Sequence, residues 1–299
     1  MKSSSYFHGG NHREAARRYG LSPNEILDFS ANINSWANSL GIEKIVKANL
    51  KEIYHYPDPQ CAELIKQISQ YLGVDRENIL AGNGSTELIY LAARALLPRR
   101  ALIFAPTFFE YERALKACGG EPKFLFLKES QGFSISIQKI IEAIKDVEAV
   151  FICNPNNPTG TFFPEEELLE LVKITKERKI SLILDESYLD FKHSGESLVR
   201  EAQGTRHLLV LRSFTKFFAL AGLRLGYGVG GRSVIEKMAH FKEPWTVNCL
   251  AQTVGIYLLR NEENIKKIRD AVNKETEFLF GQLSRIEGLK PGTFTYHKL

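Results

Sequence analysis

A series of short apolar runs in the middle of the chain constrains the fold more than any other feature of the sequence. The runs are rich in Ile, Val, Leu and Phe without strict alternation, which is typical of strands buried on both faces. Amphipathic segments of helical length lie between them, such as the stretch that begins at Ser85 and the one that follows Pro164. The alternation predicts a three-layer α/β/α domain with a mostly parallel sheet. The apolar runs begin at Ala101, Lys123, Ala149, Ile180, His207 and Leu225.

Three segments of different character indicate how the chain is divided. Residues 1–50 are rich in Asn, Ser and Gly, and they predict an irregular arm with part of a small domain. Residues 51–290 hold the apolar runs and have apolar positions at helical spacing from Trp245 to Phe280, so they predict one large domain that ends in long helices. Residues 291–299 end in the apolar-aromatic run GTFTYHKL, which predicts a strand at the start of a C-terminal small domain.

Composition excludes several classes of function. The net charge of +4 is too small and too scattered to argue for nucleic acid or a membrane surface as a partner. None of the four cysteines forms a C-x-x-C pair, so we expect neither a metal site nor a disulfide framework. The N-terminus has no apolar run of signal-peptide length, and no stretch approaches the ~20 apolar residues that a membrane span needs. We therefore expect a cytoplasmic protein with reduced thiols.

The segment SFTKFFALAGLRLGY, from Ser213 to Tyr227, carries the strongest chemical signal. It follows an apolar strand, and burial of a lysine at such a strand end disfavours the ammonium form and lowers the pKa. A lysine of this kind is suited to Schiff-base chemistry. The hydroxyls of Ser213 and Thr215 and the charge of Arg224 would form an anion cradle of phosphate type around Lys216. The alternative is a surface loop with an incidental Lys and Arg.

Three further segments place polar residues after strands or before a helix. AGNGSTE begins at Ala81 and precedes a helix, where glycines and free N–H groups can bind phosphate; a plain N-cap is the alternative. NPNNPTG begins at Asn154 after an apolar strand and is compatible with a simple turn. LDESYLDF places Asp185 at the end of an apolar strand. A buried carboxylate there is costly unless it meets a cation, such as a protonated pyridine nitrogen. The alternative is that Asp185 caps a helix.

These segments, in this order, resemble the class I aminotransferases over nearly the whole chain. The resemblance implies the aspartate-aminotransferase-like fold (fold type I) and pyridoxal 5'-phosphate as coenzyme, held covalently by Lys216. It implies that Asp185 pairs with the ring nitrogen, that Asn157 and Tyr188 contact the ring oxygen, and that Phe108 stacks on the ring. The implied phosphate-binding residues are Gly84, Ser85, Thr86, Ser213, Thr215 and Arg224.

Strings near the N-terminus discriminate within this family. HGGN, which begins at His8, and LDFSANIN are similar to the threonine-phosphate decarboxylases of cobalamin biosynthesis. That resemblance implies a phosphorylated amino acid as substrate, bound by His8, Gly9 and Asn32 together with Asn157. It implies decarboxylation of L-threonine O-3-phosphate to (R)-1-amino-2-propanol O-2-phosphate. Tyr56, in HYPD, matches a tyrosine that the family donates to the neighbouring subunit's coenzyme phosphate, so a homodimer is implied as well. The implied catalytic residues are Lys216, Asp185 and Tyr188.

Two other interpretations remain open. Histidinol-phosphate aminotransferases share the HYPD-like string, the asparagine loop and the lysine segment, and would use the same coenzyme for amino transfer. The second alternative is a homologue that binds coenzyme but has impaired catalysis. It arises because relatives of this kind continue past the position of Leu299 into a C-terminal small domain, whose arginines bind the substrate's carboxylate and phosphate. We expect the chain to lack that segment.

Overall fold

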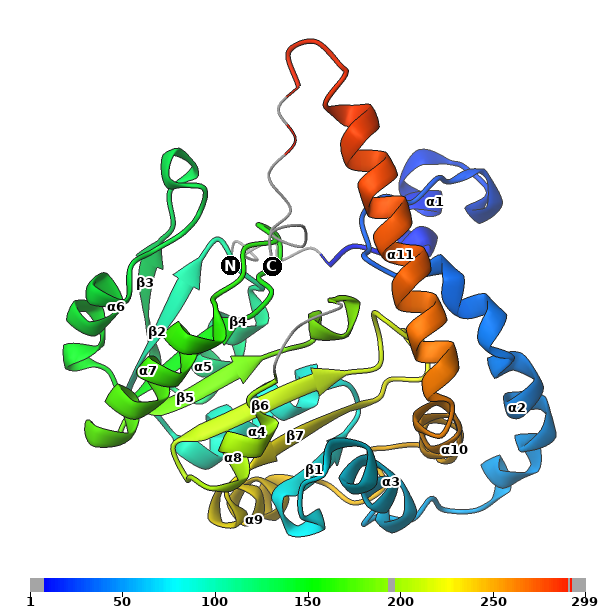
Figure 1. Cartoon of the computed structure of the whole chain (residues 1–299). Coiled ribbons are helices and arrows are strands. Elements are labelled where there is room, and N and C mark those ends of the chain that lie inside the picture. The colour runs from blue at the N-terminus through cyan, green and yellow to red at the C-terminus, as the bar shows by residue number, and fades with distance from the viewer. Residues whose placement is uncertain (1–7, 193–196, 290, 292–299) are drawn as a thin grey trace.

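One seven-stranded sheet forms the centre of the computed structural model, which describes residues 8–192, 197–289 and 291 (Figure 1). The strand order is β1-β7-β6-β5-β4-β2-β3. Strands β3, β2, β4, β5 and β6 pair in parallel, while β7 runs antiparallel to both of its neighbours, β1 and β6. The sheet is therefore mostly parallel, as predicted. The strands are β1 Ile79–Gly82, β2 Arg100–Ala105, β3 Glu121–Phe126, β4 Ala149–Cys153, β5 Ser181–Asp185, β6 Leu208–Ser213 and β7 Gly226–Gly230.

Helices cover both faces of the sheet and bury two separate cores. On β4, Val150 and Ile152 face one core while Phe151 and Cys153 face the other, which explains why the central strands are apolar at successive positions. This arrangement confirms the predicted three-layer α/β/α class (Figure 1). One face packs against α4 Ser85–Leu96, α5 Glu110–Ala117 and α9 Arg232–Phe241. The other packs against α3 Ala62–Leu72, α6 Ile137–Ala143, α7 Glu165–Glu177, α8 Val199–Gln203 and α10 Cys249–Leu259.

Two strands differ from the prediction. Strand β3 lies at the sheet edge, and Phe126 is 70% exposed, so its apolar run does not mark a strand buried on both faces. Strand β1 was not predicted, because its four residues give too short an apolar run before the glycine-rich turn. It nevertheless pairs along its whole length with β7.

The first fifty residues are more helical than their composition indicates. They contain α1 His12–Tyr19 and α2 Ile42–Ala48. The polar residues that suggested irregular structure instead cap helical turns, since the side chains of Asn11 and Asn34 accept hydrogen bonds from backbone N–H groups that follow them. The 3-10 turns are η1 Pro23–Glu25, η2 Ser35–Leu40, η3 Leu50–Tyr54, η4 Arg76–Asn78, η5 Glu129–Gln131, η6 Ile144–Asp146 and η7 Leu189–Phe191.

The predicted C-terminal helices are present, with a later start. Trp245 has a left-handed backbone, and α10 begins only at Cys249, where the Asn248 side chain caps it. Helix α11 (Glu262–Leu283) follows, contacts η2 and η7, and rises out of the layered body (Figure 1). The predicted strand at 292–299 lies outside the described residues, and the division into domains stays a prediction. No helix in the described ranges combines the length and the hydrophobicity needed to cross a membrane.

Strand β7 approaches the start of α4 so closely that only glycine fits between them. A Cβ on Gly226 would lie 2.6 Å from the backbone nitrogen of Ser85 and 2.8 Å from the carbonyl oxygen of Arg212. Backbone atoms cannot rotate away as the end of a side chain can. The contact therefore fixes the N-terminus of α4 against the centre of the sheet.

We expect Gly226→Ala to lower the free energy of unfolding by about 1–3 kcal/mol, because the added methyl overpacks a rigid contact. Gly228→Ala is the matched control on the same strand, since its Cβ would come no closer than 3.4 Å to its neighbours. Urea unfolding followed by circular dichroism measures both variants. Equal stability of the two variants would contradict the proposed backbone contact.

Candidate coenzyme site

The predicted residues converge on a cavity of about 330 Å³ at the carboxyl ends of three parallel strands. Cys153, Asp185 and Ser213, the last residues of β4, β5 and β6, all line it. Ser85 and Glu110, the first residues of α4 and α5, line it as well. Strand carboxyl ends and helix N-termini are where open α/β sheets bind ligands. The predicted site residues along the cavity are His8, Ser85, Thr86, Phe108, Asn157, Asp185, Tyr188, Ser213, Thr215, Lys216 and Arg224.

Lys216 is a partly buried amine held in place through its own backbone. The segment before η2 clamps this loop, since the backbone N–H of Asn34 donates to the carbonyl of Lys216 (3.3 Å) and its side chain donates to the carbonyl of Phe217 (2.8 Å). Burial lowers the pKa of Lys216, the charge of Arg224 lowers it further, and the Asp185 carboxylate opposes both effects. The pKa of Lys216 is therefore lower than that of an exposed lysine, which makes the nucleophilic neutral amine easier to form.

A cradle suited to phosphate lies between the start of α4 and the loop after β6. The guanidinium of Arg224 covers Gly84, where a Cβ would lie 2.5 Å from Nη2, and Gly84 has a φ of +81°. Only glycine therefore permits this approach. The hydroxyls of Ser213 and Thr215 are 2.8 Å apart. A fixed cation, hydroxyl groups and a helix N-terminus together fit a phosphate monoester.

Asp185 is a buried carboxylate, 3% exposed. One oxygen accepts hydrogen bonds from the hydroxyl (2.5 Å) and backbone N–H (3.0 Å) of Ser187, and the other accepts from the hydroxyl of Tyr111 (2.7 Å). Burial raises the pKa of Asp185, and these hydrogen bonds together with the charge of Lys216 oppose the rise. The bond to the Ser187 backbone resembles the cap that was the alternative interpretation, but a cap does not explain the Tyr111 contact or the cavity. A protonated ring nitrogen fits this environment.

Asn157 and Tyr188 form a polar edge of the cavity. The Asn157 side chain donates to the Tyr188 hydroxyl over 3.3 Å. Burial raises the pKa of Tyr188 to about 12, and a hydrogen bond with the side chain of Asn32 opposes the rise. Asn32, Asn157 and Tyr188 also line a neighbouring cavity of about 1100 Å³. The ring of Phe108 lines the coenzyme cavity and packs edge-on against Tyr111, with centroids 5.7 Å apart.

Four predicted residues do not line the coenzyme cavity themselves. Gly84 lies under Arg224, and Asn32 reaches the site through Tyr188. Gly9 packs its backbone on Ser30, where a Cβ would lie 1.7 Å from the carbonyl oxygen. Tyr56 is 82% exposed and its ring lies tilted against that of Trp245, with centroids 4.8 Å apart. Its implied role in a neighbouring subunit stays a prediction.

Sequence reasoning missed four cavity residues. Tyr111 lies three positions after Phe108 at the start of a helix, and that spacing could have indicated a shared direction. Ser187 lies two positions after Asp185, the spacing of a side-chain-to-backbone turn. Neither Glu110 nor Cys153 carried a local signal. Both line the cavity because α5 begins there and β4 ends there.

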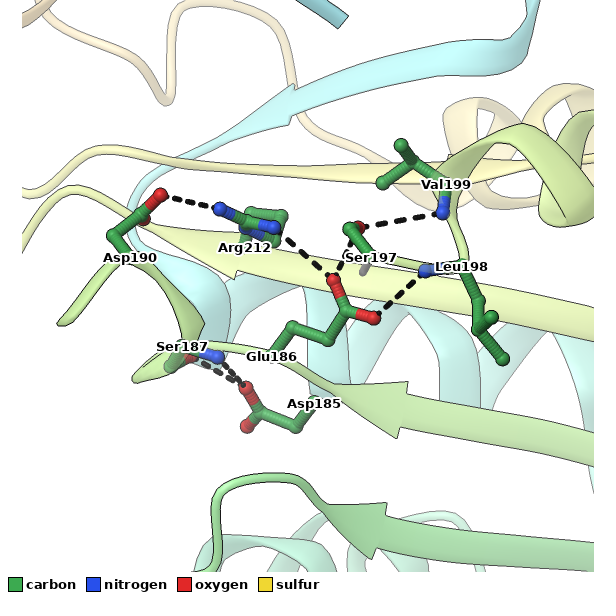
Figure 2. Close-up of polar contacts among 8 residues, drawn as sticks. All are labelled: Asp185, Glu186, Ser187, Asp190, Ser197, Leu198, Val199 and Arg212. Carbon is green, nitrogen blue, oxygen red and sulfur yellow. Dashed lines mark hydrogen bonds and ion pairs between the residues drawn. The ribbon is translucent and has the colours of Figure 1, made fainter. Parts of the chain in front are cut away.

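A second buried charge network supports the loop after β5 from the other side (Figure 2). Arg212, 5% exposed, pairs with Glu186 at 3.1 Å and also with Asp190. Glu186 accepts two further hydrogen bonds, from the hydroxyl of Ser197 (2.5 Å) and the backbone N–H of Leu198 (3.0 Å). Removal of one partner of a buried pair typically costs about 3–5 kcal/mol. The network therefore stiffens the segment that carries Asp185 and Tyr188.

The family model "Aminotransferase class I and II" matches residues 24–294. Threonine-phosphate decarboxylase of Salmonella typhimurium is 41% identical over 257 residues, which are 85% of this chain and 70% of that protein. The crystal structure of L-threonine-O-3-phosphate decarboxylase from Porphyromonas gingivalis has a TM-score of 0.78 and 28% identity, covering 89% of this chain and 79% of that one.

Histidinol-phosphate aminotransferase from Clostridium acetobutylicum is similar at the level of structure too. Its crystal structure has a TM-score of 0.81 and 32% identity, again covering 89% of this chain and 79% of that one. The likeness confirms the predicted aspartate-aminotransferase-like fold and extends along most of the described elements. The chain therefore belongs to the aminotransferase class I and II family, whose coenzyme is pyridoxal 5'-phosphate.

Proposed function

We propose that this chain catalyses the decarboxylation of L-threonine O-3-phosphate to (R)-1-amino-2-propanol O-2-phosphate, a step of cobalamin biosynthesis. The bond from Cα to the carboxylate breaks, carbon dioxide leaves, and a proton takes its place on Cα. The observation that carries the proposal is His8, which the N-terminal arm places in the same cavity as Lys216. An imidazole there offers a donor for a phosphorylated substrate in addition to the cradle for the coenzyme. The 41% identity to the Salmonella decarboxylase supports the same assignment.

The residues divide the work of such a reaction. When bound, pyridoxal phosphate supplies an aldehyde that condenses with amines and a ring that accepts the electron pair released at Cα. Asp185 would keep the ring nitrogen protonated, and Arg224 with the α4 N-terminus would hold the phosphate. Lys216, with its lowered pKa, would exchange places with the substrate amine and then move the proton at Cα. Asn157 and Tyr188 would fix the ring oxygen.

A histidinol-phosphate-type aminotransferase is the second candidate. It is favoured by the TM-score of 0.81 to the Clostridium acetobutylicum enzyme and by a cavity that would serve both reactions. Whether Cα loses carbon dioxide or a proton depends on which of its bonds stands perpendicular to the coenzyme ring. Groups that orient the substrate, rather than those that hold the coenzyme, decide that choice.

We also propose a homodimer in which Tyr56 reaches the coenzyme phosphate of the partner. Its support is the exposure of an apolar surface on and after η3, where Tyr54 and Tyr56 are each 82% exposed. Surfaces of this kind are typical of protein contacts. Sedimentation of the holoenzyme tests whether the protein is a dimer. The coenzyme affinity of a Tyr56→Phe variant tests whether the Tyr56 hydroxyl contacts the coenzyme phosphate.

Decarboxylation predicts that the coenzyme-loaded protein releases carbon dioxide from L-threonine O-3-phosphate and keeps its coenzyme in the aldehyde form. The measurement is trapped labelled carbon dioxide from carboxyl-labelled substrate, with L-threonine as the unphosphorylated control. Transfer of an amino group to 2-oxoglutarate without carbon dioxide release would move the assignment to the aminotransferase. A chain that takes up coenzyme but does neither would support the impaired homologue.

For Lys216 we predict a pKa below the ordinary value of a solvent-exposed lysine. In the apoprotein, Arg224→Gln should raise the Lys216 pKa, because it removes a repelling charge, and Asp185→Asn should lower it, because it removes an attracting one. Competitive acylation across pH, read by mass spectrometry, gives each lysine's pKa. Borohydride reduction of the holoenzyme should then attach the coenzyme to Lys216, and attachment elsewhere would refute the site.

For Asp185 we predict that Asn substitution slows turnover by about 10²–10³-fold with coenzyme still bound, since electrostatic stabilisation is a large catalytic contribution. Tyr111→Phe removes one hydrogen bond to the same carboxylate. It should slow turnover about ten- to hundredfold, as expected for a bond to a charged group. Turnover and coenzyme affinity are measured for both variants. Near wild-type turnover of Asp185→Asn would reduce Asp185 to a turn-forming residue.

A further inference from the structure

The ring of His8 is fixed although much of it is accessible. Its side chain is 52% exposed, yet Nε2 lies 2.9 Å from Oε1 of Glu110, which is 102 positions further along the chain. The ring also packs on Phe109, with centroids 4.5 Å apart. An exposed histidine near the start of a chain would otherwise sample many orientations. Here one buried carboxylate selects the orientation that faces the cavity.

Glu110 is itself held rigidly. It begins α5 and is only 3% exposed. Arg113 donates to Oε1 over 2.6 Å, and the hydroxyl of Tyr90 donates to Oε2 over 2.9 Å. Both oxygens are therefore engaged from different directions, and the carboxylate cannot turn when His8 is loaded with a ligand. A histidine oriented by a second group that is itself fixed is the arrangement expected of a positioned binding residue.

A second clasp holds the arm just beyond His8. Gly9 packs on the backbone of Ser30, and the N–H of Gly10 donates to the Ser30 hydroxyl over 2.8 Å. His12 then contacts Asp28 at 2.7 Å. The arm is thus anchored on two sides, to the segment around Ser30 and to α5. The contact with Glu110 is the one that directs an imidazole into the cavity.

We propose that Glu110 is a positioning residue for the substrate, which fixes the His8 ring so that it binds the phosphate group of a phosphorylated amino acid. The proposal rests on the proposed function for the identity of that substrate. Glu110 would act through His8 and would touch neither the coenzyme nor the reacting atoms. Its contribution is preorganisation, because the arm is ordered before the substrate arrives.

Loss of the carboxylate should weaken substrate binding more than it slows the chemical step. We expect Glu110→Ala to raise KM for threonine phosphate by about ten- to hundredfold, as for loss of a hydrogen bond to a charged group, with a smaller change in kcat and unchanged coenzyme affinity. Glu110→Gln keeps a polar partner for His8 and should recover part of the loss. Binding of threonine phosphate, measured by calorimetry on the holoenzyme, should change in parallel with KM.

A double-mutant cycle separates this role from a structural one. If Glu110 acts through His8, then His8→Ala combined with Glu110→Ala should bind threonine phosphate no more weakly than His8→Ala alone. Tyr90→Phe is the matched control, because it removes a hydrogen bond to the same carboxylate and leaves the His8 contact in place. Glu112→Gln, on the same helix, controls for loss of charge. Glu112→Gln should leave KM unchanged, and Tyr90→Phe should raise it much less than Glu110→Ala does, because the His8 contact stays in place.

Additive losses in the cycle, or an equal loss in Tyr90→Phe, would overturn the role of Glu110 even if carbon dioxide is released normally. Failure of the wild type to release carbon dioxide would instead overturn the proposed function. In that case the coupling between His8 and Glu110 is still measured, from the affinity for threonine phosphate relative to that for L-threonine. Loss of discrimination between these two ligands in Glu110→Ala, but not in Tyr90→Phe, supports the positioning role.

Discussion

Burial of two opposite charges in one cavity is the constraint on which the site depends. Asp185 alone would be driven toward its neutral form by desolvation, and so would Lys216. Each raises the stability of the other's charged form, and Tyr111 and Ser187 supply the remaining donors to the carboxylate. The pKa of the Lys216 amine stays below that of an exposed lysine. The Asp185 carboxylate still needs a further cation to offset the cost of its burial. A protonated pyridine nitrogen beside a primary amine satisfies both conditions, so the site's electrostatics favour the family's coenzyme before any substrate is considered.

Two consecutive carboxylates, Asp185 and Glu186, show how strand geometry divides scaffold from chemistry. Successive side chains at the end of a strand point to opposite faces of the sheet. Glu186 therefore meets the buried Arg212, a permanent cation that compensates it within the protein (Figure 2). Asp185 faces the cavity, where its protein partners are hydroxyl and N–H donors. The residue without a guanidinium partner is the one available to a ligand, although both are buried to a similar degree.

Patterns that are local in the chain could be predicted from the sequence, and contacts between distant segments could not. All six apolar runs gave strands, β5 and β6 end in the polar residues Asp185 and Ser213, and their parallel order brought Asp185 and Lys216 into one cavity. Strand β1 was missed because four residues carry little periodicity. Tyr111 and Glu110 were missed because their partners lie 74 and 102 positions away. The roles assigned to the individual site residues, and the division into domains, stay predictions.

The coenzyme cradle and the arm differ in how they are built, and this difference bears on reaction choice. The cradle consists of strand ends and a helix N-terminus whose backbone contact at Gly226 leaves no room for movement. His8 instead belongs to an exposed arm that polar contacts hold in place. Substitutions in the arm can therefore reorient a substrate without disturbing the coenzyme.

Decarboxylation and amino transfer need the same coenzyme contacts and differ in the orientation of the bonds at Cα. We therefore expect the two activities to diverge at positions like His8 and Glu110 rather than at Lys216 or Asp185. Glu110 is the point where the two parts meet, since it belongs to the rigid domain and holds the imidazole of the arm.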